Sequence, residues 1–304
     1  MIRLALALLG AASLLSLSAA VHAQSTPAAP TSAPVATPLP HISIVTIGSG
    51  SPVVLIPGLS SPRAVWDGVA GRLARHHRVI LVQVNGFGGD APGENLKDGL
   101  LAGVVADLHF YFARHKLSGV PVVGHSMGGL VAMMWAKAHP VDVGKAMIVD
   151  ALPFVGLLFG PDATVAAVTP RGRVIRDQMA ASYGKPADPA AAEAVATGLT
   201  ATPDARAKVT RWVMAADPRV GAQAFYEDLT TDLRPDLPAL TTPLTIVYPW
   251  AARGPSEAQA SALYRGAYAG TPNAHFVAIA DSAHFVMLDQ PAAFQAAVAA
   301  FLKR

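Results

Sequence analysis

Two hydrophobic patterns alternate along the chain from His41 onward. Short β-branched runs predict strands, and longer stretches with apolar residues at helical spacing predict helices. Strands are expected at 41–47, 52–56, 78–84, 120–123, 145–149, 244–248 and 275–279, and helices at 65–75, 96–115, 130–138 and 291–302. This alternation favours an α/β fold, with a mostly parallel sheet that is covered by helices on both faces.

Two parts of the chain depart from a simple alternation of strands and helices. The first two expected strands are separated only by Gly48-Ser49-Gly50, which indicates a hairpin. Residues 153–237 break the alternation, because they are helical in character and contain no clear strand. We interpret them as a helical insertion between two sheet strands, with core segments at 41–152 and 238–304.

The N-terminal 40 residues differ from the rest of the chain. A charged start at Arg3, an apolar stretch at 4–20 and the small-residue site Val21-His22-Ala23 are typical of a secretory signal peptide over 1–23. A retained membrane anchor is the alternative. The Pro/Ala-rich segment 24–40 is expected to be a mobile linker. The sequence therefore predicts a periplasmic or secreted protein without stable membrane insertion after cleavage.

Composition excludes several classes of protein. With 52% hydrophobic and 14% charged residues, the chain is not disordered throughout, although the signal peptide inflates the first figure. The net charge is only +3 and the basic residues are scattered, so nucleic acid is not an expected partner. The chain has no cysteine, which excludes disulfides, thiolate metal sites and a cysteine nucleophile, and which suits export.

The segment Gly124-His125-Ser126-Met127-Gly128 follows an expected strand and precedes an expected helix. The G-x-S-x-G pattern places a serine on a sharp turn with its hydroxyl exposed, and side chains at the two glycines would clash there. The following helix directs its positive N-terminal end at the reaction centre. Ser126 is therefore the candidate nucleophile, and the Met127 amide is the first candidate oxyanion donor.

At this point the chain resembles the α/β-hydrolase fold family, particularly its small serine esterases and related lipases and peptidases. The resemblance covers residues 41–303 and rests on three segments in the family's order, Ile56-Pro57-Gly58-Leu59, Gly124-His125-Ser126-Met127-Gly128 and Asp281-Ser282-Ala283-His284-Phe285. It implies a mostly parallel eight-stranded sheet with a helical lid after the sixth strand, where 153–237 falls. It also implies that Leu59 supplies the second oxyanion donor.

A serine hydroxyl needs a base to take its proton. Of the ten histidines, His284 lies just past the last expected strand and before the closing helix, where a base could reach the turn at Ser126. His125 is expected to point away from Ser126 across that turn. His284 is therefore the candidate base, and the family's final histidine loop resembles its surroundings.

The third member of such a site, an acid that orients the histidine, departs from the family's usual pattern. The stretch after the expected strand at 244–248 has no carboxylate, and Ala252 occupies the usual position. Asp150, at the end of the expected strand 145–149, is the favoured acid, since some family members place theirs there. Glu257 is the alternative, and a Ser-His dyad or another carboxylate stays open. Asp281 is interpreted as a turn residue.

Phe87, Phe154 and Phe159 are candidates to line a substrate pocket, with few charges between residues 152 and 160. No cofactor-binding or metal-ligating motif is found near the site. The favoured function is a serine carboxylesterase that cleaves a neutral or apolar small-molecule ester through an acyl-enzyme. An aminopeptidase- or lactonase-like hydrolase is one alternative. An aminopeptidase needs carboxylates to hold the amine of its substrate, and the sequence offers Glu193, Asp217, Glu227 and Asp228. An inactive binding homologue is another. The oligomeric state is not predicted.

Overall fold

The computed structural model describes residues 36–304. The expected signal peptide and most of the expected linker lie outside the described residues. Within 36–304, no helix has both the length and the apolar character that a membrane crossing requires.

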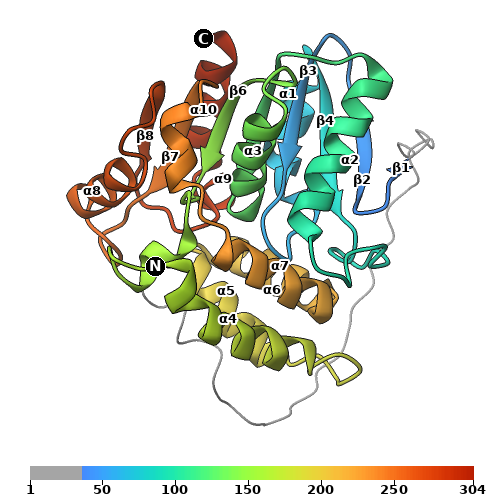
Figure 1. Ribbon diagram of the computed structural model, residues 1–304, viewed down its shortest axis with the longest axis vertical. Coiled ribbons are helices and arrows are strands. Elements are labelled where there is room, and N and C mark those ends of the chain that lie inside the picture. The colour runs from blue at the N-terminus through green and yellow to red at the C-terminus, as the bar shows by residue number, and fades with distance from the viewer. Residues whose placement is uncertain (1–35) are drawn as a thin grey trace, which may run out of the picture.

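An eight-stranded sheet forms the centre of the molecule (Figure 1). Its strand order is β1-β2-β4-β3-β5-β6-β7-β8, and all neighbours from β4 to β8 pair in parallel, whereas β1–β2 and β2–β4 are antiparallel. The strands are β1 (Thr37–Pro38), β2 (Ile42–Ile47), β3 (Ser51–Ile56), β4 (His77–Val84), β5 (Val120–His125), β6 (Val143–Val149), β7 (Leu244–Pro249) and β8 (Ala274–Ile279). The mostly parallel sheet that was expected from the sequence is confirmed.

The expected hairpin is wrong. β2 and β3 do not pair with each other, because β4 lies between them and bonds to both. Gly48 and Gly50 have positive φ angles of 73° and 103°, and their backbone passes close to residues 74–77, which lead into that intervening strand. The sheet also begins at Thr37–Pro38, within the stretch that was expected to be linker.

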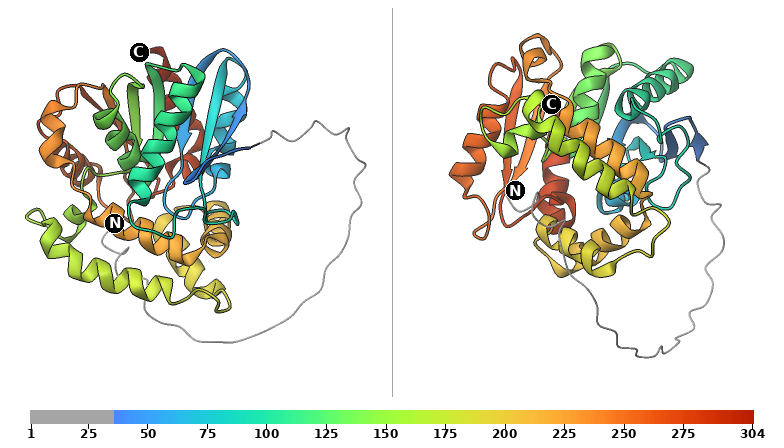
Figure 2. Two further views of the ribbon diagram at one scale, coloured as in Figure 1. Left: turned by 45° about the vertical axis from the view of Figure 1, so that its right-hand side comes forward. Right: turned by 60° about the horizontal axis from the view of Figure 1, so that its bottom comes forward.

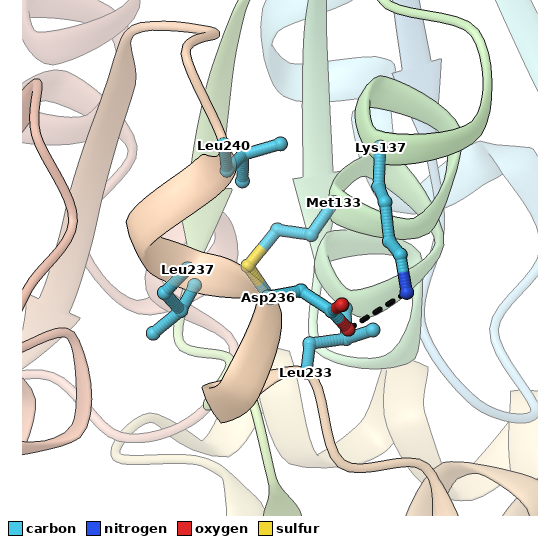
Figure 3. Close-up of a pocket in the computed structure, with 6 residues that line it drawn as sticks. All are labelled: Met133, Lys137, Leu233, Asp236, Leu237 and Leu240. Atoms are coloured by element: carbon cyan, nitrogen blue, oxygen red, sulfur yellow. Dashed lines mark ion pairs between the residues drawn. The ribbon is translucent and has the colours of Figure 1, made fainter.

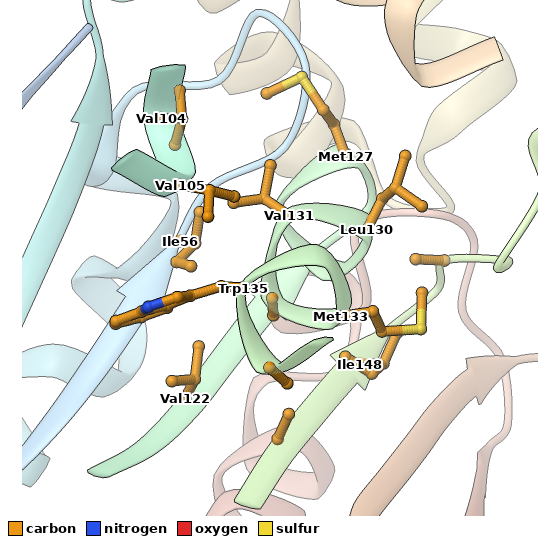
Figure 4. Close-up of a cluster of buried hydrophobic side chains, with 14 of the residues drawn as sticks. Ile56, Val104, Val105, Val122, Met127, Leu130, Val131, Met133, Trp135 and Ile148 are labelled. Carbon is orange, nitrogen blue, oxygen red and sulfur yellow. The ribbon is translucent and has the colours of Figure 1, made fainter. Parts of the chain in front are cut away.

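Helices cover both faces of the sheet because its strands are apolar on both faces. In β3, Val54 and Ile56 belong to one core cluster, and Val53 and Leu55 belong to the other. The first face is covered by α2 (Leu100–His115), α3 (Met127–Ala138) and α8 (Glu257–Ala267), and the second by α1 (Asp67–Leu73) and α10 (Pro291–Lys303). Figure 4 shows α3 inserting Met127, Leu130, Val131 and Trp135 into the first cluster.

Helix α2 begins four residues later than expected. Gly99, at φ 88°, stands at its N-cap and is left-handed, so the helix starts at Leu100 and not at Leu96. Leu96 is 46% exposed, which is why its apolar side chain does not extend the buried face. Helix α1 is preceded by a 3-10 turn, η2 (Arg63–Trp66).

Four helices occupy the segment between β6 and β7. They are α4 (Val165–Ala180), α5 (Pro189–Leu199), α6 (Pro203–Ala215) and α7 (Pro218–Thr230), flanked by the 3-10 turns η3 (Val155–Phe159) and η4 (Arg234–Ala239). Figures 1 and 2 show them gathered at one end of the sheet, the end to which β6 delivers the chain. The carboxyl ends of the parallel strands meet at this end, so it is the natural place for a site.

Candidate active site

Ser126 occupies a sharp turn between β5 and α3. Its φ and ψ are 54° and −127°, a conformation that only a tightly packed turn maintains for a residue with a side chain. A Cβ on Gly124 would collide with the backbone of Gly128, and a Cβ on Gly128 would lie 2.5 Å from the carbonyl oxygens of Ile56 and Pro57. The two glycines of the motif are therefore required because backbone passes backbone at both positions.

The loop after β3 passes directly beside Ser126. A Cβ on Gly58 would lie 2.9 Å from the Cβ of Ser126, so the backbone of Gly58 approaches the serine closely. Within residues 36–304, neither the Leu59 nor the Met127 amide donates a hydrogen bond to another protein group. Two amides next to Ser126 are thus left with their N–H groups available, as an oxyanion site needs.

His284 and Asp150 form a hydrogen-bonded pair. The Nδ1 atom of His284 lies 2.6 Å from Oδ2 of Asp150, although the residues are 134 positions apart. The Asp150 side chain is 1% exposed and that of His284 is 21% exposed, so the carboxylate is buried and the imidazole reaches the surface of the site.

Sheet register explains why this pair lies at the same edge as Ser126. The Ser126 amide donates to the Val149 carbonyl over 2.9 Å, and the Asp150 amide donates to the Val247 carbonyl over 2.8 Å. Ser126 and Asp150 therefore leave the ends of neighbouring strands at the same level. The ring of His125, the residue before Ser126, lies 4.6 Å from the ring of His284.

The other candidate acids lie elsewhere. Glu257 is exposed in the first turn of α8, where it follows the N-cap Ser256. Asp281 is exposed and has a φ of 52°, which is the geometry of a turn residue. Of Asp150, Glu257 and Asp281, only Asp150 bonds the His284 ring.

The histidine loop is held by two contacts that sequence reasoning missed. His125 is fully buried, and its Nε2–H donates to the carbonyl of His284 over 3.0 Å. Burial lowers the pKa of His125 well below its usual value, so the ring is neutral. Asp289, in α9 (Val286–Asp289), accepts from the Ala283 and Ala201 amides, each over 3.0 Å, and so ties the loop to the α5–α6 turn.

The four carboxylates considered for binding a substrate amine lie in different surroundings. Asp217 pairs with Arg219 at 2.6 Å, and Glu193 is exposed on α5. Glu227 accepts from the first amides of α2 over 2.7 to 3.0 Å. Asp228 is buried, and its Oδ1 has no hydrogen-bond partner. Burial raises the pKa of Asp228 to about 7, and the nearby His284 opposes this shift.

The three aromatic residues expected near a substrate have different surroundings. Phe87 and Phe154 are fully buried, the first in the core cluster that also contains residues of α2 and α3, and the second in a cluster with Val168 and Leu229. Phe159 is 42% exposed. The contact of each with a substrate stays a prediction.

Two other features of the described residues lie apart from Ser126. His109, His139 and Asp142 have possible metal-ligand atoms within 4.8 Å of one another, but His139 stands at the C-terminal end of α3, whose N-terminal end holds Ser126. Figure 3 shows a small pocket between α3 and η4, whose lining includes an ion pair of 2.8 Å between Lys137 and Asp236. It contains none of the candidate site residues.

Comparison with known proteins identifies the family. A model of the α/β hydrolase family matches residues 53–297, which is most of the chain. The protein belongs to the α/β-hydrolase family. It is therefore a hydrolase by family, as the expected fold and the resemblance suggested.

Individual relatives are more distant. A pimeloyl-[acyl-carrier protein] methyl ester esterase of Aeromonas hydrophila is 33% identical over 116 residues, which are 37% of this chain and 42% of the esterase. An N-formylmaleamate deformylase of Pseudomonas putida is 31% identical over 34% of this chain and 38% of the deformylase. The chain thus spans well under half of the length of these curated relatives.

Solved structures show the same fold over nearly the whole chain. A thermophilic esterase from Thermogutta terrifontis superposes with a TM-score of 0.71 at 21% identity, covering 90% of this chain and 98% of the esterase. At this identity the likeness concerns the α/β-hydrolase fold alone.

Proposed function

We propose that the protein is a serine hydrolase that cleaves neutral carboxylic esters through an acyl-enzyme on Ser126. The observation that carries the proposal is the buried Asp150–His284 pair at the strand edge where Ser126 is held in a strained turn. Relatives named as esterases support the choice of reaction. We further propose that the chain is exported, on the strength of its first 23 residues.

The residues would act in this sequence. The Ser126 oxygen attacks the ester carbonyl carbon while Nε2 of His284 takes the serine proton. Asp150, which accepts from Nδ1–H, fixes the tautomer that leaves Nε2 free and stabilises the imidazolium. The Leu59 and Met127 amides donate to the oxyanion of the tetrahedral intermediate.

Collapse of that intermediate breaks the ester C–O bond, and the alcohol leaves with the proton from His284. A water molecule then attacks the acyl-serine and gives its proton to His284. The second tetrahedral intermediate releases the carboxylic acid and restores the Ser126 hydroxyl.

An ester is favoured over an N-terminal aminoacyl substrate because a substrate amine needs free carboxylates. Asp217 and Glu227 are engaged with other protein groups, and Glu193 is exposed. Asp228 alone is buried beside the site. A panel of p-nitrophenyl esters of graded acyl length, compared with aminoacyl p-nitroanilides, tests this choice, and turnover of the anilides alone would refute it.

A fluorophosphonate probe tests the nucleophile directly. We expect one covalent adduct, which mass spectrometry of peptides places on Ser126, and we expect Ser126→Ala to lose both labelling and ester turnover. Turnover should fall by a factor on the order of 10⁴ or more. The thermal unfolding midpoint of the variant serves as the control, and it should stay close to that of the wild type. A folded wild-type protein that takes no label would favour the inactive binding homologue.

A further inference from the structure

The carboxylate of Asp150 has two oxygens, and they have different partners. Oδ2 accepts from His284, while Oδ1 accepts a hydrogen bond from the phenol of Tyr264. Because both oxygens are bonded, the carboxylate cannot rotate about its Cβ–Cγ bond without breaking one of these contacts. The backbone of Asp150 has a φ of 45°, which is uncommon for a residue other than glycine. Contacts with the surrounding residues must therefore hold it in this conformation.

Tyr264 is firmly placed to make this contact. It lies on α8, is fully buried, and stacks on Tyr248 of β7 with ring centroids 4.9 Å apart and planes at 17°. The Ser256–Gln259 capping box fixes the start of α8, two turns before Tyr264. Burial and the neighbouring Asp150 raise the pKa of the Tyr264 phenol well above its usual value, so it stays protonated and donates.

The position of Tyr264 relates to the departure found in the sequence. The stretch that follows β7 has no carboxylate, and the acid is supplied instead from the end of β6. The segment after β7 therefore contributes a hydrogen-bond donor, Tyr264 of α8, rather than the acid itself. A charge-assisted hydrogen bond in a buried setting is among the stronger ones in proteins.

We propose that Tyr264 is a positioning residue for the reaction: its phenol holds the Asp150 carboxylate in the orientation that bonds His284. The inference rests on the proposed function, since it concerns the same site. In this role Tyr264 acts on the reaction through Asp150, whose Oδ1 it bonds.

The test replaces Tyr264 with phenylalanine, which removes the hydroxyl and keeps the stacked ring. We expect kcat to fall about 10-fold to 100-fold, given that hydrogen bonds to charged groups are worth about 1.5 to 3 kcal/mol, with KM changed less than about twofold. The acid limb of the pH profile of kcat/KM should also move to lower pH, because a carboxylate that is free to rotate stabilises the imidazolium less well.

Tyr268→Phe is the matched control. Tyr268 is a buried tyrosine of the same region, and its hydroxyl donates to the Ala151 carbonyl over 2.9 Å rather than to Asp150. Its removal should leave the pH profile unchanged. In an Asp150→Asn background, Tyr264→Phe should cost much less than it does alone, because its target carboxylate is already gone.

A readout that needs no turnover separates this inference from the proposed function. The low-field proton NMR resonance of His284 Nδ1–H reports its hydrogen bond to Asp150, and we expect Tyr264→Phe to shift it upfield. If the wild type hydrolyses no ester, the proposed function fails while this resonance still tests the contact. If Tyr264→Phe lowers the thermal unfolding midpoint but moves neither the resonance nor the pH profile, the positioning role is overturned.

Discussion

Asp150 and Glu257, the two candidate acids, differ clearly in their relation to His284. Asp150 bonds Nδ1 of His284, whereas Glu257 is exposed at the start of α8. We expect Asp150→Asn to lower kcat by a factor on the order of 10³ to 10⁴, because the amide favours the wrong histidine tautomer. Glu257→Gln should change kcat less than about twofold, since rim charges contribute little. Ester kinetics of the two purified variants decide the matter, and a larger loss in Glu257→Gln would exclude Asp150 as the acid.

Asp228 makes stability depend on pH. Its folded-state pKa is raised from 3.8 to about 7 by burial, so between these values the folded protein keeps a proton that the unfolded chain has released. The stabilisation from this group is present in full below pH 3.8 and is lost as the pH rises through 7. A shift of about three pKa units corresponds to about 4 kcal/mol.

We therefore expect Asp228→Asn to become progressively more stable than the wild type as the pH rises from 4 to 8. Thermal unfolding midpoints of both proteins, measured across this range, check the expectation. Glu193→Gln, an exposed change on α5, is the control. Parallel curves for the wild type and Asp228→Asn would show that the Asp228 carboxyl titrates normally.

The local motif predicted the sharp turn at Ser126, because the residues that such a turn needs lie next to one another in the sequence. Gly124, Ser126 and Gly128 pointed to the turn that the structure contains. Asp150 was harder, since its contact with His284 depends on strand order and not on spacing. Tyr264 was missed entirely, because a tyrosine at helical spacing has the same pattern whether it fills a core or bonds a carboxylate.

At the scale of elements, α2 depends on a residue from outside itself. Its N-cap is Gly99, which offers no side chain, and Glu227 of α7 instead accepts from the amides of Gly99, Leu100 and Leu101. A carboxylate at a helix N-terminus satisfies unpaired amides and interacts favourably with the helix dipole. This contact also joins α7 to the core.

We expect Glu227→Gln to lower the free energy of unfolding by about 1 to 2 kcal/mol, because the neutral amide keeps one acceptor but loses the charge. Chemical denaturation measures the change. The Glu193→Gln variant is again the control, because it removes a negative charge that caps no helix. Equal stability of Glu227→Gln and the wild type would mean that water replaces the cap without cost.

Strand pairing shows where prediction from the sequence fails at this scale. The alternation of apolar runs located seven of the strands, since burial of both sheet faces leaves a plain hydrophobic signal. It could not tell that β4 enters between β2 and β3, because two strands close in sequence look like a hairpin whether or not a third one separates them. The start of α2 was missed for a different reason: Leu96 fits the apolar pattern of the helix, but the left-handed Gly99 keeps the helix from beginning before Leu100.

The whole molecule combines a family fold with an N-terminal segment that the described residues do not include. We expect the chain, expressed in a Gram-negative host, to be recovered from the periplasm with Gln24 as its first residue. N-terminal sequencing of the purified protein checks this expectation. A fully retained Met1, with the protein in the membrane fraction, would support the anchor instead.

The position of Asp150 at the end of β6 has a practical consequence for the loop that follows β7. Residues Ala252–Gly254, after β7, are exposed and contain no candidate site residue. In a hydrolase whose acid lies in this loop, an insertion there would displace the acid. In this chain it is a suitable insertion point for an affinity peptide or a randomised library, provided that Tyr264 downstream keeps its register.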